Sequence, residues 1–208
     1  MLNIVVLVSG GGTNLQALID AQKKGEITGG KISCVISSNS DAYALQRAKK
    51  NGIPSIIVRR KAYADNDSYS EALNAALNEV NADIIVLAGF MSILSKSLTD
   101  KYRYRILNVH PSLIPSFCGD GFYGLKVHEA VLACGVKVTG ATVHFVNEVA
   151  DAGAIILQKA VDVKRGDTPE TLQKRVMEEA EWEILPRAVS LLCEGKIEII
   201  NGRAYIIE

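Results

Sequence analysis

The segment Asn108-Val109-His110-Pro111 places two polar side chains that could do chemistry at the end of an apolar run. Side chains alternate between the two faces of a strand, so Asn108 and His110 are predicted to point the same way. A carboxamide can donate a hydrogen bond to an oxyanion, and an imidazole can move a proton near neutral pH. The pattern therefore predicts acid–base catalysis at a strand end. The alternative is a strand-end Asn and His that only cap the following loop.

A glycine-rich loop, residues 9–14, separates the first apolar run from an amphipathic one. Glycines let the backbone approach an anion, and a helix N-terminus attracts negative charge. A dinucleotide-binding fingerprint would need a glycine where Leu15 stands, and no Lys-Ser or Lys-Thr follows as in a P-loop. The loop therefore predicts a phosphate monoester site. The alternative is a tight turn with Thr13 or Asn14 as the helix cap.

Short apolar runs alternate with amphipathic runs through the first half of the chain. The expected strands are residues 2–8, 32–36, 55–58, 84–88 and 106–109. The expected helices are residues 14–24, 42–50, 68–80 and 95–102. This alternation predicts a Rossmann-like, doubly wound α/β fold, with a mostly parallel sheet and helices on both faces.

The pattern changes after His110. Residues 111–124 predict a long loop, which is uncommon inside a domain and often functional. Further helices are expected at residues 127–133 and 168–192, and antiparallel strands at residues 137–146 and 154–163. Pro186 is expected to kink the long helix, whereas Thr168 and Pro169 give it a good start. Asn201-Gly202, between strands at 197–200 and 204–207, predicts a terminal type I′ hairpin.

Composition places the chain among globular proteins. Its 208 residues are 48% hydrophobic, which fits one domain at 1–208, with a phosphate-binding half at 1–110 and a second half at 111–208. The 23 basic and 23 acidic residues balance, so neither nucleic acid nor a membrane surface is an expected partner. No signal-peptide pattern and no membrane-spanning run are present, which predicts a cytoplasmic protein. The cysteine spacing predicts no metal site.

Five motifs, in this order, resemble the glycinamide ribonucleotide (GAR) transformylases of the formyltransferase family. They are Ser9-Gly10-x-Gly12-Thr13-Asn14-Leu15-Gln16, Leu87-Ala88-Gly89-Phe90-Met91, residues 108–115, residues 142–146, and Asp151-x-Gly153. The His-Pro-Ser-Leu segment and the distant Asp are shared by the wider family, whereas Gly-Thr-Asn-Leu-Gln is more specific. The resemblance implies transfer of a formyl group from 10-formyltetrahydrofolate to the amine of GAR in purine biosynthesis, without a metal.

The resemblance also implies roles for individual residues. Asn108, His110 and Asp151 correspond to the catalytic trio, in which Asp151 orients His110 and favours its charged form. The substrate-binding residues are Gly12, Thr13 and Asn14 for the phosphate and Glu181 for the amine. The folate-binding residues, divided equally between the first half and the second, folate-side half, are Met91, Ser92, Ile93, Leu94, Asn108, Asn147, Glu148, Val149, Ala150 and Asp151.

The chain departs from the family pattern at several positions, including a longer loop at Phe117–Leu125. Asn66 and Ser92 are neutral where related enzymes carry Arg, which alters contacts to the folate tail or the phosphate. The helix before Pro186 is one residue longer than usual near Glu181. The expected partners are small-molecule substrates, and the expected assembly is a monomer or homodimer.

The sequence also contains two further histidines, and three alternative functions have to be considered. His144 is expected to be a hydrogen-bonded core or supporting residue, and His128 to be a surface or capping residue. A methionyl-tRNA formyltransferase would need a further basic domain, and a formyltetrahydrofolate hydrolase usually carries an extra N-terminal domain. A non-catalytic nucleotide-binding module would use only the glycine loop and would give no role to Asn108 or His110.

Overall fold

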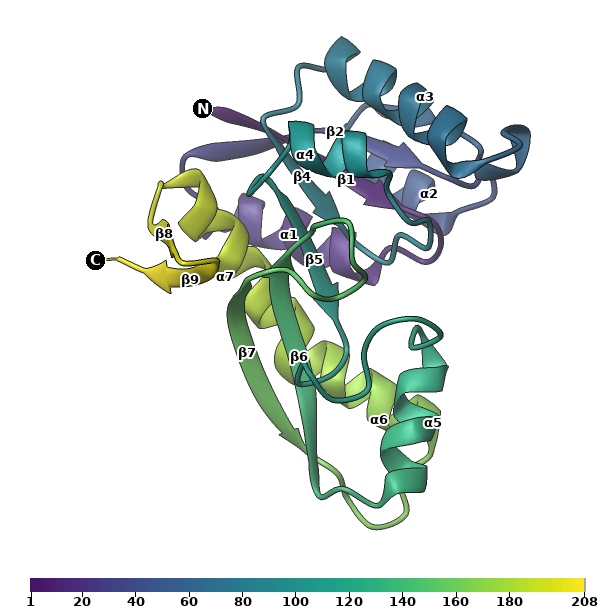
Figure 1. The fold of residues 1–208 in the computed structure, drawn as a ribbon, viewed down its shortest axis with the longest axis vertical. Helices are drawn as coiled ribbons and strands as arrows, with labels where there is room; N and C mark the ends of the chain where they lie inside the picture. Colours follow the sequence, from purple (N-terminus) through teal and green to yellow (C-terminus); the bar gives the residue numbers. More distant parts are fainter. Residues whose placement is uncertain (208) are drawn as a thin grey trace.

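The computed structural model describes residues 1–207 and centres on a seven-stranded sheet with the order β3-β2-β1-β4-β5-β6-β7 (Figure 1). Neighbours from β3 to β5 are parallel, whereas β6 is antiparallel to β5 and β7 to β6. The strands are β1 (Leu2–Val8), β2 (Gly30–Ser37), β3 (Ser55–Ile57), β4 (Ile84–Leu87), β5 (Ile106–His110), β6 (Val138–Phe145) and β7 (Ile155–Asp162). The predicted mostly parallel sheet with an antiparallel edge pair is confirmed.

Helices cover both faces of this sheet. They are α1 (Thr13–Lys23), α2 (Tyr43–Lys50), α3 (Asn66–Glu79), α4 (Lys96–Lys101), α5 (Leu125–Cys134), α6 (Pro169–Val176) and α7 (Trp182–Cys193), with a 3-10 turn at Arg60–Ala62. Ile4 and Val6 of β1 belong to one core with α1, α2 and α7, whereas Val5 and Leu7 belong to a second core with α3 and α4. Because strand side chains alternate, this apolar run fills both cores, as a doubly wound fold requires.

The strand order reverses at the boundary between β1 and β4, which are paired although β2 and β3 lie between them in sequence. In open α/β sheets, ligands bind outside the carboxyl ends of strands at this kind of switch point. Here those ends lead into the glycine loop after β1, the segment at Gly89 after β4, and His110 at the end of β5. The fold therefore gathers three of the sequence motifs at one edge.

The long C-terminal helical stretch is irregular, but Pro186 is not the cause that the sequence suggested. Residues Met177–Glu181 form a π-turn between α6 and α7, and the Trp182 N–H donates to the Met177 carbonyl five residues back. Pro186 lies inside α7. Its missing N–H would have paired with the carbonyl of Trp182, at the junction where the π-turn already alters the hydrogen bonds. The helix therefore continues through the proline.

The other elements agree with their predicted positions to within a few residues. Asp65 caps α3, accepting a 2.8 Å hydrogen bond from the Ser68 N–H, so that helix starts slightly earlier than expected. The terminal hairpin consists of β8 (Ile197–Ile200) and β9 (Arg203–Ile206). Its turn residues Asn201 and Gly202 have φ of 50° and 76°, which confirms the type I′ prediction. Across residues 1–207, no helix has the length and apolarity needed to cross a membrane.

Candidate active site

Asp151 meets His110 although 40 residues separate them in the chain. His110 is the last residue of β5, and Asp151 lies in the loop that joins β6 to β7. The Nδ1 atom of His110 and the Oδ2 atom of Asp151 are 3.4 Å apart, and both side chains are largely buried. Asp151 has a φ of 54°, an uncommon backbone conformation for a residue other than glycine. The loop thus holds the carboxylate against the imidazole.

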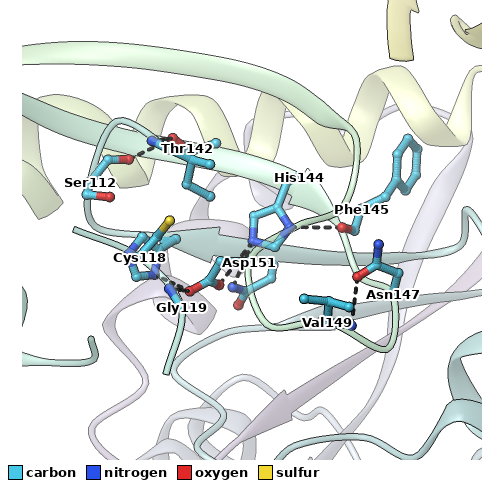
Figure 2. Close-up of polar contacts among 12 residues, drawn as sticks. Ser112, Cys118, Gly119, Thr142, His144, Phe145, Asn147, Val149 and Asp151 are labelled. Carbon is cyan, nitrogen blue, oxygen red and sulfur yellow. Dashed lines mark hydrogen bonds and ion pairs between the residues drawn. The ribbon is translucent and has the colours of Figure 1, made fainter. Parts of the chain in front are cut away.

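His144 links Asp151 to Asn108. It lies directly opposite Asn108 in the β5–β6 ladder, and its Nε2 is 3.2 Å from the Asn108 amide nitrogen and 3.5 Å from Asp151 Oδ1. Its Nδ1–H donates to the Phe145 carbonyl at 2.8 Å, because a carbonyl can only accept. Its other ring nitrogen, Nε2, therefore lies between the Asn108 amide nitrogen and the Asp151 carboxylate. Figure 2 shows the His144 ring between Phe145 and Asp151. The expectation of a hydrogen-bonded supporting histidine is confirmed.

The loop at residues 111–124 closes over the trio. The His110 Nε2–H donates to the Phe117 carbonyl at 2.9 Å. The Gly119 N–H donates to Asp151 Oδ2 at 2.9 Å (Figure 2). At its start, the loop is anchored by Thr142, whose hydroxyl donates to the Ser112 carbonyl at 2.6 Å. Both catalytic candidates are thus tied to loop backbone in this structure.

Burial and neighbouring charge act in opposite directions on the pKa values of this pair. Burial lowers the pKa of His110, although the Phe117 carbonyl and the Asp151 charge act in the opposite direction. Asp151 does favour the charged imidazole, as expected, but the loss of solvation outweighs it. Burial also opposes ionisation of Asp151, yet hydrogen bonds from His144 and Gly119 keep the pKa of this carboxyl below its usual value. Asp151 is thus held as a carboxylate, while burial and the Asp151 charge oppose each other in setting the charge of His110.

The glycine loop has a structural reason for its last glycine. Gly12 is the N-cap of α1 with a φ of 72°, and no side chain caps the helix, so the alternative cap by Thr13 or Asn14 is wrong. A Cβ on Gly12 would lie 2.6 Å from the Ala44 Cβ, whereas Gly10 and Gly11 have open space. Left-handed φ and close packing both require glycine there. The first N–H groups of α1 have no intrahelical partners, so they can receive an anion.

Glu181 lies next to the start of α1. It is 6% exposed, and its Oε2 accepts a 2.6 Å hydrogen bond from the Asn14 amide. Burial raises the pKa of Glu181 to about 7, despite the opposing Asn14 hydrogen bond. Glu181 is the last residue of the π-turn, and such turns accommodate one extra residue within a helix. The π-turn therefore absorbs the additional residue noted in the sequence and leaves Glu181 facing Asn14.

Two adjoining cavities join these groups. The larger, about 440 Å³, has lining residues that include the trio, Thr13, Asn14, Glu181, Met91, Ser92, Ile93 and Ala150. The smaller, about 130 Å³, is lined by Ser92, Ile93, Leu94, Asn108, Asn147, Glu148, Val149, Ala150 and Asp151, among others. Gly12 lies beside the larger cavity without lining it, and Asn66, which begins α3, lines neither. Every other predicted site residue thus lines one cavity or the other.

One histidine of the larger cavity was assigned wrongly from the sequence. His128 is fully buried and lines the cavity that contains His110, so the surface or capping role is wrong. It lies on the buried face of α5, with Val131 one turn later. That i,i+3 spacing is the pattern in the sequence that could have placed His128 inside. Within residues 1–207, no group of three or more His, Cys, Asp or Glu side chains is arranged to hold a metal ion.

Comparison with known proteins agrees with this geometry. A family profile described as formyl transferase matches residues 2–189. A phosphoribosylglycinamide formyltransferase of Haemophilus influenzae is 40% identical over 206 residues, which cover 99% of this chain and 94% of that protein. The chain therefore belongs to the formyl transferase family.

Within that family it groups with the phosphoribosylglycinamide formyltransferases. The crystal structure of glycinamide ribonucleotide transformylase 1 from Symbiobacterium toebii superposes with a TM-score of 0.93 and 41% identity, covering 100% of this chain and 95% of that one. The trifunctional purine biosynthetic protein adenosine-3 of Bos taurus is 46% identical over 201 residues, or 96% of this chain. The chain spans only 19% of that longer relative.

Proposed function

We propose that this chain transfers the formyl group of 10-formyltetrahydrofolate to the amine of GAR, as a cytoplasmic enzyme of purine biosynthesis. The observation that carries the proposal is the convergence of Asn108, His110 and Asp151 on one cavity that also reaches Asn14 and Glu181. The adjoining cavity lined by Asn147–Asp151 extends the site away from the glycine loop. The family relationship supports the same reaction.

The acceptor substrate fits the side of the cavity near α1. Its phosphate would be held by the free N–H groups at the start of α1, from Gly12 to Asn14. Glu181 would then lie beside the rest of the molecule, at hydrogen-bonding distance from Asn14. An ammonium or amine at Glu181 would favour the carboxylate, which burial holds close to its neutral form.

The folate fits the side near β4 and the loop after β6. Met91, Ile93 and Val149 are 56%, 59% and 57% exposed, an unusual exposure for apolar side chains that line cavities. A flat aromatic ring system would cover them and remove that apolar surface from water. The bound folate supplies the formyl group, and the residues around it would orient its carbonyl toward Asn108 and His110.

In this proposal, acyl transfer develops negative charge on the formyl oxygen. The Asn108 amide donates to that oxygen, held in place by His144; losing one such donor typically costs about 2.7–4 kcal/mol. His110 takes the proton from the attacking amine and returns it to the departing nitrogen, a contribution of roughly 10²–10⁴-fold. Asp151 steadies the imidazolium that forms. Before it can accept that proton, Nε2 of His110 must leave the Phe117 carbonyl and be free of its own proton, with the ring proton on Nδ1 toward Asp151. The loop therefore has to move during the cycle.

The test is a spectroscopic assay of folate deformylation, run with and without GAR. Turnover that requires GAR, with formyl-GAR as product, supports the proposal. Turnover without GAR would instead make the chain a formyltetrahydrofolate hydrolase. No turnover, combined with tight nucleotide binding, would favour a non-catalytic binding module.

A further inference from the structure

His128 is a buried polar group that the proposed mechanism leaves unused. Its side chain is fully buried, and neither ring nitrogen has a hydrogen-bond partner among the residues that the structure describes. Buried polar groups in native proteins are nearly always paired, and an unpaired one costs stability. An imidazole left unpaired at this position needs a partner from outside the chain.

The residues around His128 indicate which ligand would supply that hydrogen-bond partner. His128 lies on α5, which packs against α6, and it lines the larger cavity together with His110, Gln173 and Glu181 (α5 and α6 lie side by side in Figure 1). It does not line the smaller cavity near Asn147. His128 thus belongs to the part of the larger cavity that is lined from α5, α6 and the π-turn, which is the side that the proposed function gives to the acceptor substrate.

The charge state of His128 defines the chemistry of the group it can bind. Burial, followed by repulsion from His110, lowers the pKa of His128 to about 4, so the ring is neutral at physiological pH. The other titratable groups that line this cavity are Asp120, Tyr123, Asp151 and Glu181. A neutral imidazole offers one donor and one acceptor. It suits an amide or hydroxyl, which can also donate and accept, better than a phosphate.

We propose that His128 is a substrate-contacting residue that hydrogen-bonds an amide or hydroxyl group of the acceptor substrate, between its phosphate and its amine. This inference rests on the proposed function, because it assigns His128 to GAR rather than to the folate. It explains why α5 keeps a polar side chain in a dry position beside Val127 and Val131. Binding of the acceptor would supply the hydrogen-bond partner that no described residue offers to the His128 ring.

Two substitutions at position 128 test the role. His128→Phe keeps a flat ring but removes both hydrogen-bonding groups, so the KM for GAR should rise about tenfold while the KM for the folate stays within about twofold. His128→Asn retains a donor and an acceptor and should raise the KM for GAR less than His128→Phe does. Because His128→Phe removes an unpaired buried polar group, its melting temperature should equal or exceed that of the wild type.

Thr139→Val is the matched control. The Thr139 hydroxyl on β6 is also buried without a partner, and Thr139 does not line the larger cavity. This substitution should leave both KM values unchanged. If the KM for GAR responds equally to Thr139→Val and His128→Phe, the inference is wrong.

Other outcomes separate this inference from the proposed function. A wild-type chain that does not transfer formyl to GAR overturns the proposed function. A wild type that does so, with an unchanged KM for GAR in His128→Phe, overturns the role of His128 alone. If a His128 variant does not fold, a ¹⁵N NMR titration of the wild type with GAR tests the same contact. The His128 ring nitrogens should shift on addition of GAR, and unshifted resonances at saturation would contradict the inference.

Discussion

At the scale of single residues, burial and neighbouring charge act in opposite directions on the pKa values of the site. Burial lowers the pKa of His110, whereas the neighbouring carboxylate of Asp151 raises it. In the proposed reaction His110 has to accept a proton, so only its neutral form is active. The rate should therefore rise with pH through the pKa of His110, at a pH below the usual histidine value.

Asp151→Asn tests this pairing. The amide keeps the shape of the carboxyl but cannot stabilise the imidazolium, so kcat should fall by about 10²-fold or more. The pKa of His110 should fall further, because the negative charge that raised it is gone. The acidic limb of kcat against pH should thus move to lower pH. Near-normal turnover with an unshifted limb would remove Asp151 from the mechanism, and circular dichroism checks that the variant is folded.

In the absence of substrates, Glu181 should make the folded protein less stable as the pH rises. Burial raises the pKa of its carboxyl to about 7 in the fold, from an ordinary value of 4.5. Above the unfolded pKa the unfolded chain releases this proton first, so stability falls as the pH rises from 4.5 through 7. Once Glu181 is ionised in both the folded and the unfolded protein, the loss in free energy of unfolding amounts to about 3 kcal/mol.

Glu181→Gln should remove this pH dependence. The glutamine oxygen can still accept from Asn14, and no charge is buried at any pH. The variant should therefore be more stable than the wild type at about pH 8 and similar to it at about pH 4.5. Urea unfolding at several pH values measures the difference. A constant difference between the two proteins across this range would show that Glu181 is not held near neutrality.

At the scale of elements, the π-turn is what lets the last long helix serve the site. Residues Met177–Glu181 take up an extra residue without moving α7 off the core, where Leu185 and Val189 are fully buried. The sequence showed the extra residue near Glu181. A helical period alone did not show whether α7 would rotate or the helix would bulge. Packing on both sides of the junction decides that, because a rotation would expose the buried face of α7.

Deletion of Glu179 should convert the π-turn into regular α-helix. Glu179 is exposed and lies within the turn, so residues on either side can keep their positions. The melting temperature should change by only a few degrees. Deletion of Arg187, which is exposed inside α7, is the control. It rotates all later helical residues by about 100° and should destabilise the protein severely. Equal losses in the two deletions would contradict the role of the bulge.

At the scale of the whole molecule, one core joins the two halves of the chain. Ile4 and Val6 of β1 belong to the same buried cluster as Val143 of β6 and Leu185 of α7. The site is divided between the same two halves, because His110 ends the first half, residues 1–110, and Asp151 lies in the second half, residues 111–208. Neither half can bury its apolar surface alone, so the proposal of a single domain over residues 1–208 predicts cooperative folding.

Unfolding in urea should therefore show one transition. Fluorescence of Trp182, the only tryptophan of the chain, should change together with far-ultraviolet circular dichroism. A fragment of residues 1–110 should remain unfolded, because it lacks the strands and the helix that complete the larger core. Two separated transitions, or a folded fragment, would contradict a single domain.

The sequence by itself determined the elements and the class of fold. Alternating apolar and amphipathic runs located β1 to β7 to within a few residues, because strand and helix periods differ and Gly, Pro and Asn mark the ends. It also placed Asn108 and His110 on one strand end and identified the glycine loop. These properties depend on neighbours in the chain, which a single sequence displays.

Only the tertiary structure decided which distant groups meet. It brought Asp151 to His110 and His144 to Asn108, buried His128 at the larger cavity, and left His110 bonded to the Phe117 carbonyl. It also added the burial that lowers the pKa of His110 against the effect of Asp151, because burial depends on everything packed around the ring. Contacts and solvation of this kind arise from segments far apart in the chain, so local pattern and spacing do not contain them.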